Sequence, residues 1–207
     1  MLVYLIKYPQ KLYIPLLEHL VITAFTLALS LALATLISAL IIRSRVLSQV
    51  TIGAFSVVYS IPSLALFALL IPVLGLGRDT AIIVLVLYNQ FLLVRNIVAG
   101  FASIDSQVLE AARGMGMGET QLFFQIRLPL AAPMILAGVR LAIVSTIGIA
   151  TIAATINAGG LGTILFDGLR TRNTVKILWG TVLSSTLAIF ANQLLAWAEK
   201  RQARNIQ

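Results

Sequence analysis

The sequence predicts an all-α membrane protein with about five transmembrane helices. Of its 207 residues, 59% are hydrophobic and only 11% are charged, and the mean hydropathy is +1.00. A water-soluble domain carries about 25% charged residues, so lipid must cover much of this surface. Several charge-free stretches are also long enough to cross a bilayer, which takes about 20 apolar residues in a helix.

The expected crossings follow the spacing of charges and prolines. Residues 20–42 carry no charge and form the first expected helix. A second charge-free stretch, 46–77, is longer than one crossing requires, so we expect a helix over about 50–72 that is kinked near Pro62. The whole chain, 1–207, is expected to form a single transmembrane domain. The remaining helices are expected at about 80–100, 133–157 and 177–198.

The distribution of positive charge predicts the orientation. Five crossings place the two termini on opposite sides of the membrane. With the C-terminus in the cytoplasm, nine of the 15 lysines and arginines fall on the inner side. This excess favours an outside N-terminus and a cytoplasmic C-terminus. It also places the long polar insertion at about 101–132 in the cytoplasm.

Composition excludes several classes of function. The formal net charge is +8, but the basic residues are scattered between apolar runs, so a nucleic-acid partner is not expected. Cysteine is absent, which excludes disulfides and thiol catalysis. The single histidine, His19, follows Glu18 and has no second His or Cys to share a metal. We therefore expect an interfacial histidine, no metal and no cofactor.

Polar residues within the apolar helices are candidates for a translocation path. Asn89 and Gln90 are the most unusual, because two amides in hydrocarbon need partners, and we favour a buried, pore-side position for them. For the other candidates, packing between helices remains an equal alternative, since hydroxyls can bond back to their own helix. The candidates are Ser60, Pro62, Asn89, Gln90, Thr155 and Asn157.

The polar insertion carries a spaced motif, E-A-A-x3-G-x9-I-x-L-P. We expect a helix, a glycine turn and a second short helix over 119–127. Gly116 would supply a sharp bend, and Pro129 with Pro133 would end the second helix before the next crossing. The defining residues are Glu110, Ala111, Ala112, Gly116, Ile126, Leu128 and Pro129.

This motif resembles the EAA loop of the membrane subunits of bacterial ABC importers. The resemblance implies a multi-pass permease in the bacterial plasma membrane, with a type I, methionine-permease-like core of five helices. It also implies two ATP-binding subunits that dock on the motif, a second permease copy or a homologous permease, and a substrate-binding protein. The chain has no G-x-x-x-x-G-K-[ST] sequence, so we expect ATP hydrolysis in another subunit and no enzyme activity here.

Four further sequence strings narrow the resemblance to one subfamily of importer permeases. They are similar to permeases for glycine betaine, carnitine and choline, and they lie at 61–65, 74–77, 109–117 and 158–162. Methionine-type importers share the five-helix plan, so another small solute such as methionine is the alternative. No soluble extension follows Glu199, which predicts a separate binding protein.

A glycine-rich string and the class of transporter each have two interpretations. The glycine-rich string 158–162 is expected to be a flexible outer loop, which either meets the binding protein or is merely solvated. An ATP-independent channel or carrier is the alternative from another class. Such carriers often show inverted repeats and intramembrane acids, and neither is evident in the sequence.

Overall fold

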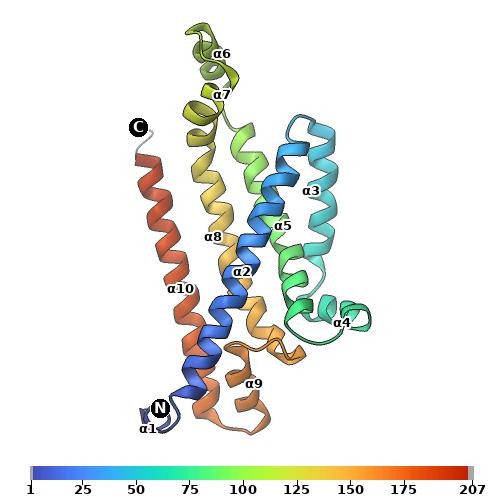
Figure 1. The fold of residues 1–207 in the computed structure, drawn as a ribbon, viewed down its shortest axis with the longest axis vertical. Coiled ribbons are helices and arrows are strands. Elements are labelled where there is room, and N and C mark those ends of the chain that lie inside the picture. The colour runs from blue at the N-terminus through green and yellow to red at the C-terminus, as the bar shows by residue number, and fades with distance from the viewer. Residues whose placement is uncertain (1, 205–207) are drawn as a thin grey trace.

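The computed structural model describes residues 2–204, which form helices and short turns with no strand among them (Figure 1). Two short segments differ from α-helix: the π-helix Phe123–Arg127 and the 3₁₀-helix Ala154–Ile156. The α-helices are α1 (Leu2–Lys7), α2 (Gln10–Ile41), α3 (Arg45–Ser60), α4 (Ser63–Leu74), α5 (Arg78–Ala102), α6 (Ser106–Gly114), α7 (Glu119–Leu122), α8 (Leu128–Ala153), α9 (Gly162–Arg170) and α10 (Thr174–Arg204).

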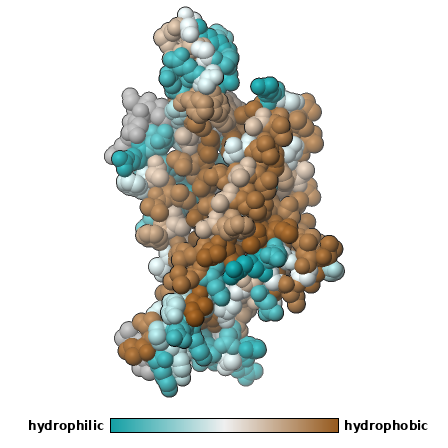
Figure 2. All heavy atoms as spheres, in the orientation of Figure 1, coloured by the Kyte–Doolittle hydropathy of each residue, from teal (hydrophilic) through white to brown (hydrophobic). Residues whose placement is uncertain are grey.

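The long helices α2, α5, α8 and α10 form the body of the protein, and α8 packs against the other three (Figure 1). Within the described residues these four spans are long and apolar enough to cross a membrane, and the bent pair α3–α4 would make a fifth. Helix α5 is the most enclosed, and its side chains Val84, Leu85, Leu93 and Val94 are at most 1% exposed. Figure 2 shows a broad apolar band around the middle and polar side chains at both ends, as expected for a membrane protein.

The two ends of the body carry different structures (Figure 1). We call the end that carries α6 and α7 the hairpin end, and the opposite end, with α1 and α9, the loop end. The turn between α2 and α3 lies at the hairpin end.

The second crossing is broken rather than kinked, which corrects the expected helix over 50–72. Helices α3 and α4 meet at an angle of 95°. Ile61 is extended, with φ −71° and ψ 131°, because a residue that precedes a proline is pushed out of the helical region. Its carbonyl accepts a hydrogen bond from the Tyr88 hydroxyl on α5. A side chain of another helix therefore satisfies the carbonyl that the break leaves free. Helix α4 turns away from the axis of α3.

The first crossing is longer than expected and includes a proline. Helix α2 begins at Gln10 rather than at about residue 20, with Pro9 at its N-cap. Pro15 lies inside the second turn, where its missing N–H leaves the carbonyl of Lys11 without a helical donor. Lys11 is exposed near the chain end, so water can satisfy that carbonyl. The proline thus does not end the helix.

Candidate functional site

The motif residues at 101–132 form a compact hairpin that projects beyond the body of the protein (Figure 1). Its first helix, α6, begins where the Asp105 side chain accepts a hydrogen bond of 2.9 Å from the Gln107 N–H, which caps the helix. It ends at Gly114, and the chain reverses at Gly116 with φ +85°. Glycine reaches this conformation at little cost. The expected helix, glycine turn and helix are therefore confirmed.

An ion pair closes the hairpin across the glycine turn. The Arg113 guanidinium donates to Glu119 Oε1 from Nε at 3.2 Å and from Nη2 at 3.0 Å. The pair is exposed, so its contribution to stability is small, up to about 1 kcal/mol. It links the last turn of α6 to the first turn of α7 and so fixes the angle between them.

The second arm of the hairpin runs into the membrane without a stop, which corrects the expected break at Pro129 and Pro133. The chain is helical from Glu119 to Ile156. Pro129 lies in the first turn of α8, and the Leu128 N–H before it bonds the Phe123 carbonyl in the wider π pattern. The wider hydrogen-bond pattern of the π turn accommodates the proline, which has no N–H to donate, so the helix continues. The second arm of the hairpin and α8 thus form one helical segment, Glu119–Ile156, which we call the membrane rod.

The hairpin exposes part of the motif and buries the rest. Glu110 and Ala111 are exposed, and Glu110 forms no ion pair with any residue that the structure describes. Ala112 is only 2% exposed, so its side chain lies inside the hairpin. Met115 at the tip is 74% exposed. An exposed helix with a free carboxylate, a small side chain and an apolar tip is suited to dock in a groove of another protein.

The remaining motif residues stand at the base of the hairpin. Ile126, Leu128 and Pro129 are half-buried where the π turn enters α8. Their position joins the exposed arm to the membrane rod. These residues determine the direction in which the hairpin projects, and they contribute little to its exposed surface.

The candidate path residues fall into two groups. Asn89 and Gln90 are buried at 1% and 3% exposure inside the bundle. The other four are exposed near the loop end of the membrane rod and at the α3–α4 break, and both places flank one apolar cluster that includes Phe67 and Ile156. Those four are Ser60, Pro62, Thr155 and Asn157.

The amides of α5 bind three helices together. The Asn89 amide donates to Ser30 Oγ on α2 at 3.2 Å and to Thr146 Oγ1 on α8 at 2.9 Å. The Gln90 amide donates to the Ser30 carbonyl at 3.3 Å. Sequence reasoning found the two amides but not their partners, which lie 57 to 60 residues away.

Replacing Asn89 by alanine should destabilise the protein by about 1–2 kcal/mol, because Thr146 and Ser30 lose an interhelical partner in a dry interior. The measurement is unfolding of the detergent-solubilised protein by heat. Asn192→Ala is the matched control, since Asn192 is exposed on α10, and its effect should stay within about 0.5 kcal/mol. Equal stability of the two variants would contradict a structural role for Asn89.

The glycine-rich string 158–162 is fixed rather than flexible, which corrects the expectation for this loop. The Gly160 N–H donates to Glu18 Oε2 at 3.0 Å, and the Leu161 N–H donates to His19 Nδ1 at 3.3 Å. Gly160 has φ +80°, and a Cβ there would lie 2.8 Å from His19 Nδ1. Glycine therefore lets the loop approach α2 closely.

The sequence predicted an interfacial position for His19, and the structure corrects this prediction. It is fully buried and packs under the loop. No cluster of three metal-ligating side chains exists within the described part of the chain. The adjacent pair Glu18 and His19, at the start of a long apolar helix, was the available signal for this contact.

The loop continues into helix α9, which an ion cluster fixes against α10. Lys176 Nζ lies 2.6 Å from Asp167 Oδ2, and Arg170 Nη2 lies 3.0 Å from Asp167 Oδ1. The hydrogen bonds from Lys176 and then Arg170 hold the pKa of the Asp167 carboxyl below its usual value.

A lowered pKa in the folded protein predicts acid sensitivity at this contact. The stabilisation is complete above the ordinary aspartate pKa near 4 and is lost as the pH falls through the lower folded value. We expect the protection of α9 amides against hydrogen exchange, relative to their intrinsic rates at each pH, to fall below about pH 4 in the natural protein. Asp167→Asn should show lower protection at neutral pH and lose this acid dependence, whereas Asp79→Asn should leave it unchanged. An identical acid response in Asp167→Asn would contradict the assignment.

Comparison with known proteins gives the family. The family described as "Binding-protein-dependent transport system inner membrane component" matches residues 24–204. The chain is 34% identical over 184 residues to the choline transport system permease protein OpuBB of Bacillus subtilis (strain 168), covering 89% of this chain and 85% of that protein. It is 37% identical over 184 residues to the carnitine transport permease protein OpuCB of Listeria monocytogenes, covering 89% and 84%.

The fold also matches a solved transporter. A chain of the MetNI methionine ABC transporter superposes with a TM-score of 0.74 at 20% identity, covering 95% of this chain and 96% of that chain. The predicted all-α core of a type I importer permease is therefore confirmed. This chain is a multi-pass membrane protein that belongs to the family of binding-protein-dependent transport system inner membrane components, as a permease component of an ABC importer.

Proposed function

We propose that this permease carries quaternary-ammonium osmoprotectants such as glycine betaine, carnitine or choline. The support comes from two relatives that are 34% and 37% identical to this chain over 184 aligned residues and are named as choline and carnitine permeases. We further propose that it resides in a bacterial plasma membrane, with the hairpin end in the cytoplasm and the loop end outside.

The hairpin is the proposed contact with separate ATP-binding subunits. Two such subunits would each bind the hairpin of one permease, and the two permeases would be either identical or homologous. The observation that carries this proposal is the exposed face with Glu110 and Ala111 on a hairpin otherwise held by its own contacts. A rigid exposed helix of this kind transmits force better than a mobile loop.

The membrane rod supplies the lever. Glu119 to Ile156 is helical over 38 residues, which at 1.5 Å per residue is roughly 57 Å. A displacement of the hairpin would therefore be transmitted to the loop end, where Thr155 and Asn157 lie. Hinge and shear motion between two states would open the path alternately to each side. Ser60 and Pro62 at the α3–α4 break remain proposed path residues. The buried Asn89 and Gln90 amides are proposed instead to hold α2, α5 and α8 together beside the path.

A separate substrate-binding protein is proposed to dock at the loop end. The loop held by Glu18 and His19 and the ion cluster on α9 offer a fixed, polar surface there. Cargo released from the binding protein would enter the path beside this surface. Recognition of the cargo would then rest mainly with the binding protein.

Uptake by the assembled transporter tests the proposed cargo. Cells carrying the permease with its full subunit set should accumulate labelled glycine betaine or choline after an osmotic upshift, and unlabelled carnitine should compete. Unlabelled methionine should not compete. Uptake of methionine with no uptake of any quaternary amine would overturn the proposed cargo and leave the importer class intact.

A further inference from the structure

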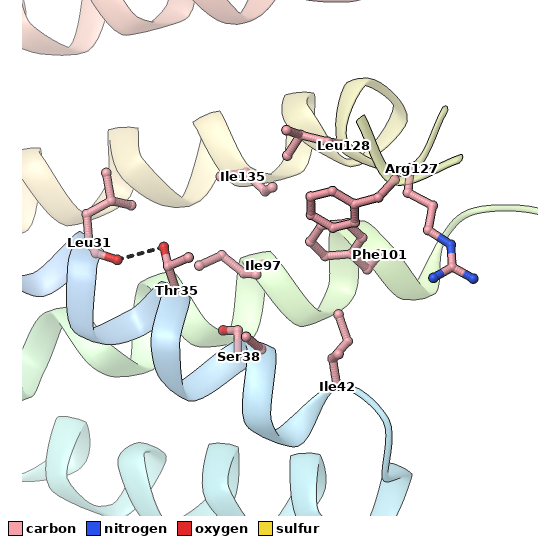
Figure 3. A pocket seen from close by; sticks show the side chains of 11 residues that line it. Leu31, Thr35, Ser38, Ile42, Ile97, Phe101, Arg127, Leu128 and Ile135 are labelled. Atoms are coloured by element: carbon pink, nitrogen blue, oxygen red, sulfur yellow. Dashed lines mark hydrogen bonds between the residues drawn. The ribbon is translucent and has the colours of Figure 1, made fainter. Parts of the chain in front are cut away.

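Two adjacent chambers, one apolar and one basic, form a groove at the hairpin end. The apolar chamber, about 380 Å³ in volume, lies between α2, α5 and α8 (Figure 3). The basic chamber, about 760 Å³, carries Arg43, Arg45 and Arg127. Ile42, Phe101 and Arg127 line both chambers, so the two lie side by side. Each volume lies within the range of ligand pockets, about 300–1,000 Å³.

The apolar chamber has the depth of one membrane leaflet. Along α2 its wall runs from Leu31 to Ile42, a rise of roughly 16 Å at 1.5 Å per residue. This is about half of the 30 Å hydrocarbon thickness of a bilayer. Figure 3 shows Leu31 at one end of this wall and the Arg127 guanidinium beyond Phe101 at the other. The chamber therefore matches an extended acyl chain with its polar end at the arginines.

The basic chamber has positive charge without a protein partner. None of its three arginines forms an ion pair within the described residues, and no carboxylate lines either chamber. Arg43, in the turn after α2, and Arg45, the first residue of α3, are exposed, whereas Arg127 is half-buried at the end of the π turn. Guanidinium groups bind phosphate in a planar, two-pronged geometry. Three such groups around one opening favour an anionic phosphate group.

A buried hydroxyl in the apolar chamber also lacks a partner. Ser38 is 2% exposed, and its Oγ makes no hydrogen bond with any described residue. Thr35, one turn earlier, instead bonds the Leu31 carbonyl of its own helix at 2.8 Å. A buried donor usually has an acceptor. The ester oxygen of a lipid would supply one at this depth, one helical turn below Ile42.

From these observations we propose that the groove is a binding site for an anionic phospholipid. One acyl chain lies in the apolar chamber, an ester oxygen faces Ser38, and the phosphate binds Arg43, Arg45 and Arg127. Basic pockets between transmembrane helices bind anionic headgroups for the same physical reason. A free polar anion would leave the apolar chamber empty, and a neutral lipid would leave the arginines unpaired. The site is independent of the transported solute.

Native mass spectrometry of the full chain, extracted from membranes in detergent, tests the site. With equal amounts of phosphatidylglycerol and phosphatidylcholine added, the natural protein should retain phosphatidylglycerol preferentially. Each arginine changed to glutamine should weaken retention about fivefold, and the lysine variants should restore most of it. Arg78→Gln, an exposed arginine at the opposite end of α5, should leave retention unchanged. Inorganic phosphate in excess should not displace the lipid.

A second variant tests the apolar chamber separately. Ala39 lines this chamber, and Ala39→Trp should fill it and abolish retention with all arginines in place. Ala32→Trp, exposed two turns earlier on α2, is the control. Equal retention of the two lipids, or an unchanged preference in both the arginine and the Ala39 variants, would overturn the proposal. So would a photo-crosslinker at Ile42 that reacts with a second copy of the chain or with an ATP-binding subunit instead of lipid.

Discussion

Replacing Gly116 by valine should lower solute uptake at least tenfold while leaving the chain inserted in the membrane. Gly116 has φ +85°, with no atom within 4 Å of a Cβ built there, so the effect comes from backbone strain and not from a clash. A residue with a side chain pays about 1–2 kcal/mol in this left-handed region, and a β-branched one more. The hairpin would open or rotate to relieve the strain, and Glu110 would leave its docking position. Uptake by the complete transporter, normalised to permease content, is the measurement.

Gly114→Val separates strain from bulk in the same hairpin. Gly114 lies two residues earlier, in the helical region, and a Cβ there also meets no atom within 4 Å. Valine at this site keeps a compatible backbone, so uptake should remain within about twofold of the natural protein. If both valine variants transport normally, the turn is not needed for coupling. If both fail equally, bulk near the ATP-binding subunit, and not the turn conformation, is the cause.

Gly162→Ala is expected to be the most destabilising small substitution in the protein. A Cβ at Gly162 would overlap the Thr151 carbonyl oxygen and lie 2.7 Å from Ala154 Cβ. Backbone atoms cannot rotate away as a side chain can, so α9 must move off the end of α8. Overpacking of this kind costs about 1–3 kcal/mol and occasionally more. Thermal unfolding in detergent should show a clear fall in Tm.

The control for this variant has the opposite expected sign. Gly148 lies in the middle of α8, with no atom within 4 Å of a Cβ built there. Gly148→Ala should therefore raise stability by about 0.5–1 kcal/mol, because alanine loses less backbone freedom in a helix. A stable Gly162→Ala variant would contradict the close packing of α9 on α8.

The hairpin was predictable from the sequence because its signals are local. The glycines that break α6, the Asp105 cap and the spaced motif all lie within one short segment. The long helices were predictable for a similar reason, since charges and apolar runs mark them directly. Their ends were less well predicted, because Pro15 and Pro129 are tolerated near the first turns of helices whose other contacts hold them.

Long-range contacts explain what the sequence could not show. The helix breaks at Pro62, and the Ile61 carbonyl that the break frees accepts a hydrogen bond from the Tyr88 hydroxyl, 27 residues away. The glycine loop is held by Glu18 and His19, which lie 142 residues before it in the chain and beside it in space. Local patterns carry no record of such pairs.

The basic groove illustrates a different limit. Arg43 and Arg45 indicate only the end of a crossing when the sequence is considered alone. Their proposed second role depends on Arg127. The π turn places Arg127 at the same chamber that Arg43 and Arg45 line at the end of α2. The resemblance to importer permeases gave no reason to group these three residues.

The measurement that tests the central claim most directly is ATP-driven uptake by the purified complex in proteoliposomes, with natural Glu110 and with Glu110→Lys. Gln107→Lys, an exposed residue three positions earlier on the same helix, is the control for added charge. The coupling role predicts that Glu110→Lys loses uptake and releases the ATP-binding subunits, whereas Gln107→Lys retains both. Normal uptake by Glu110→Lys at normal protein levels would contradict the assignment of this hairpin as the contact through which ATP drives transport.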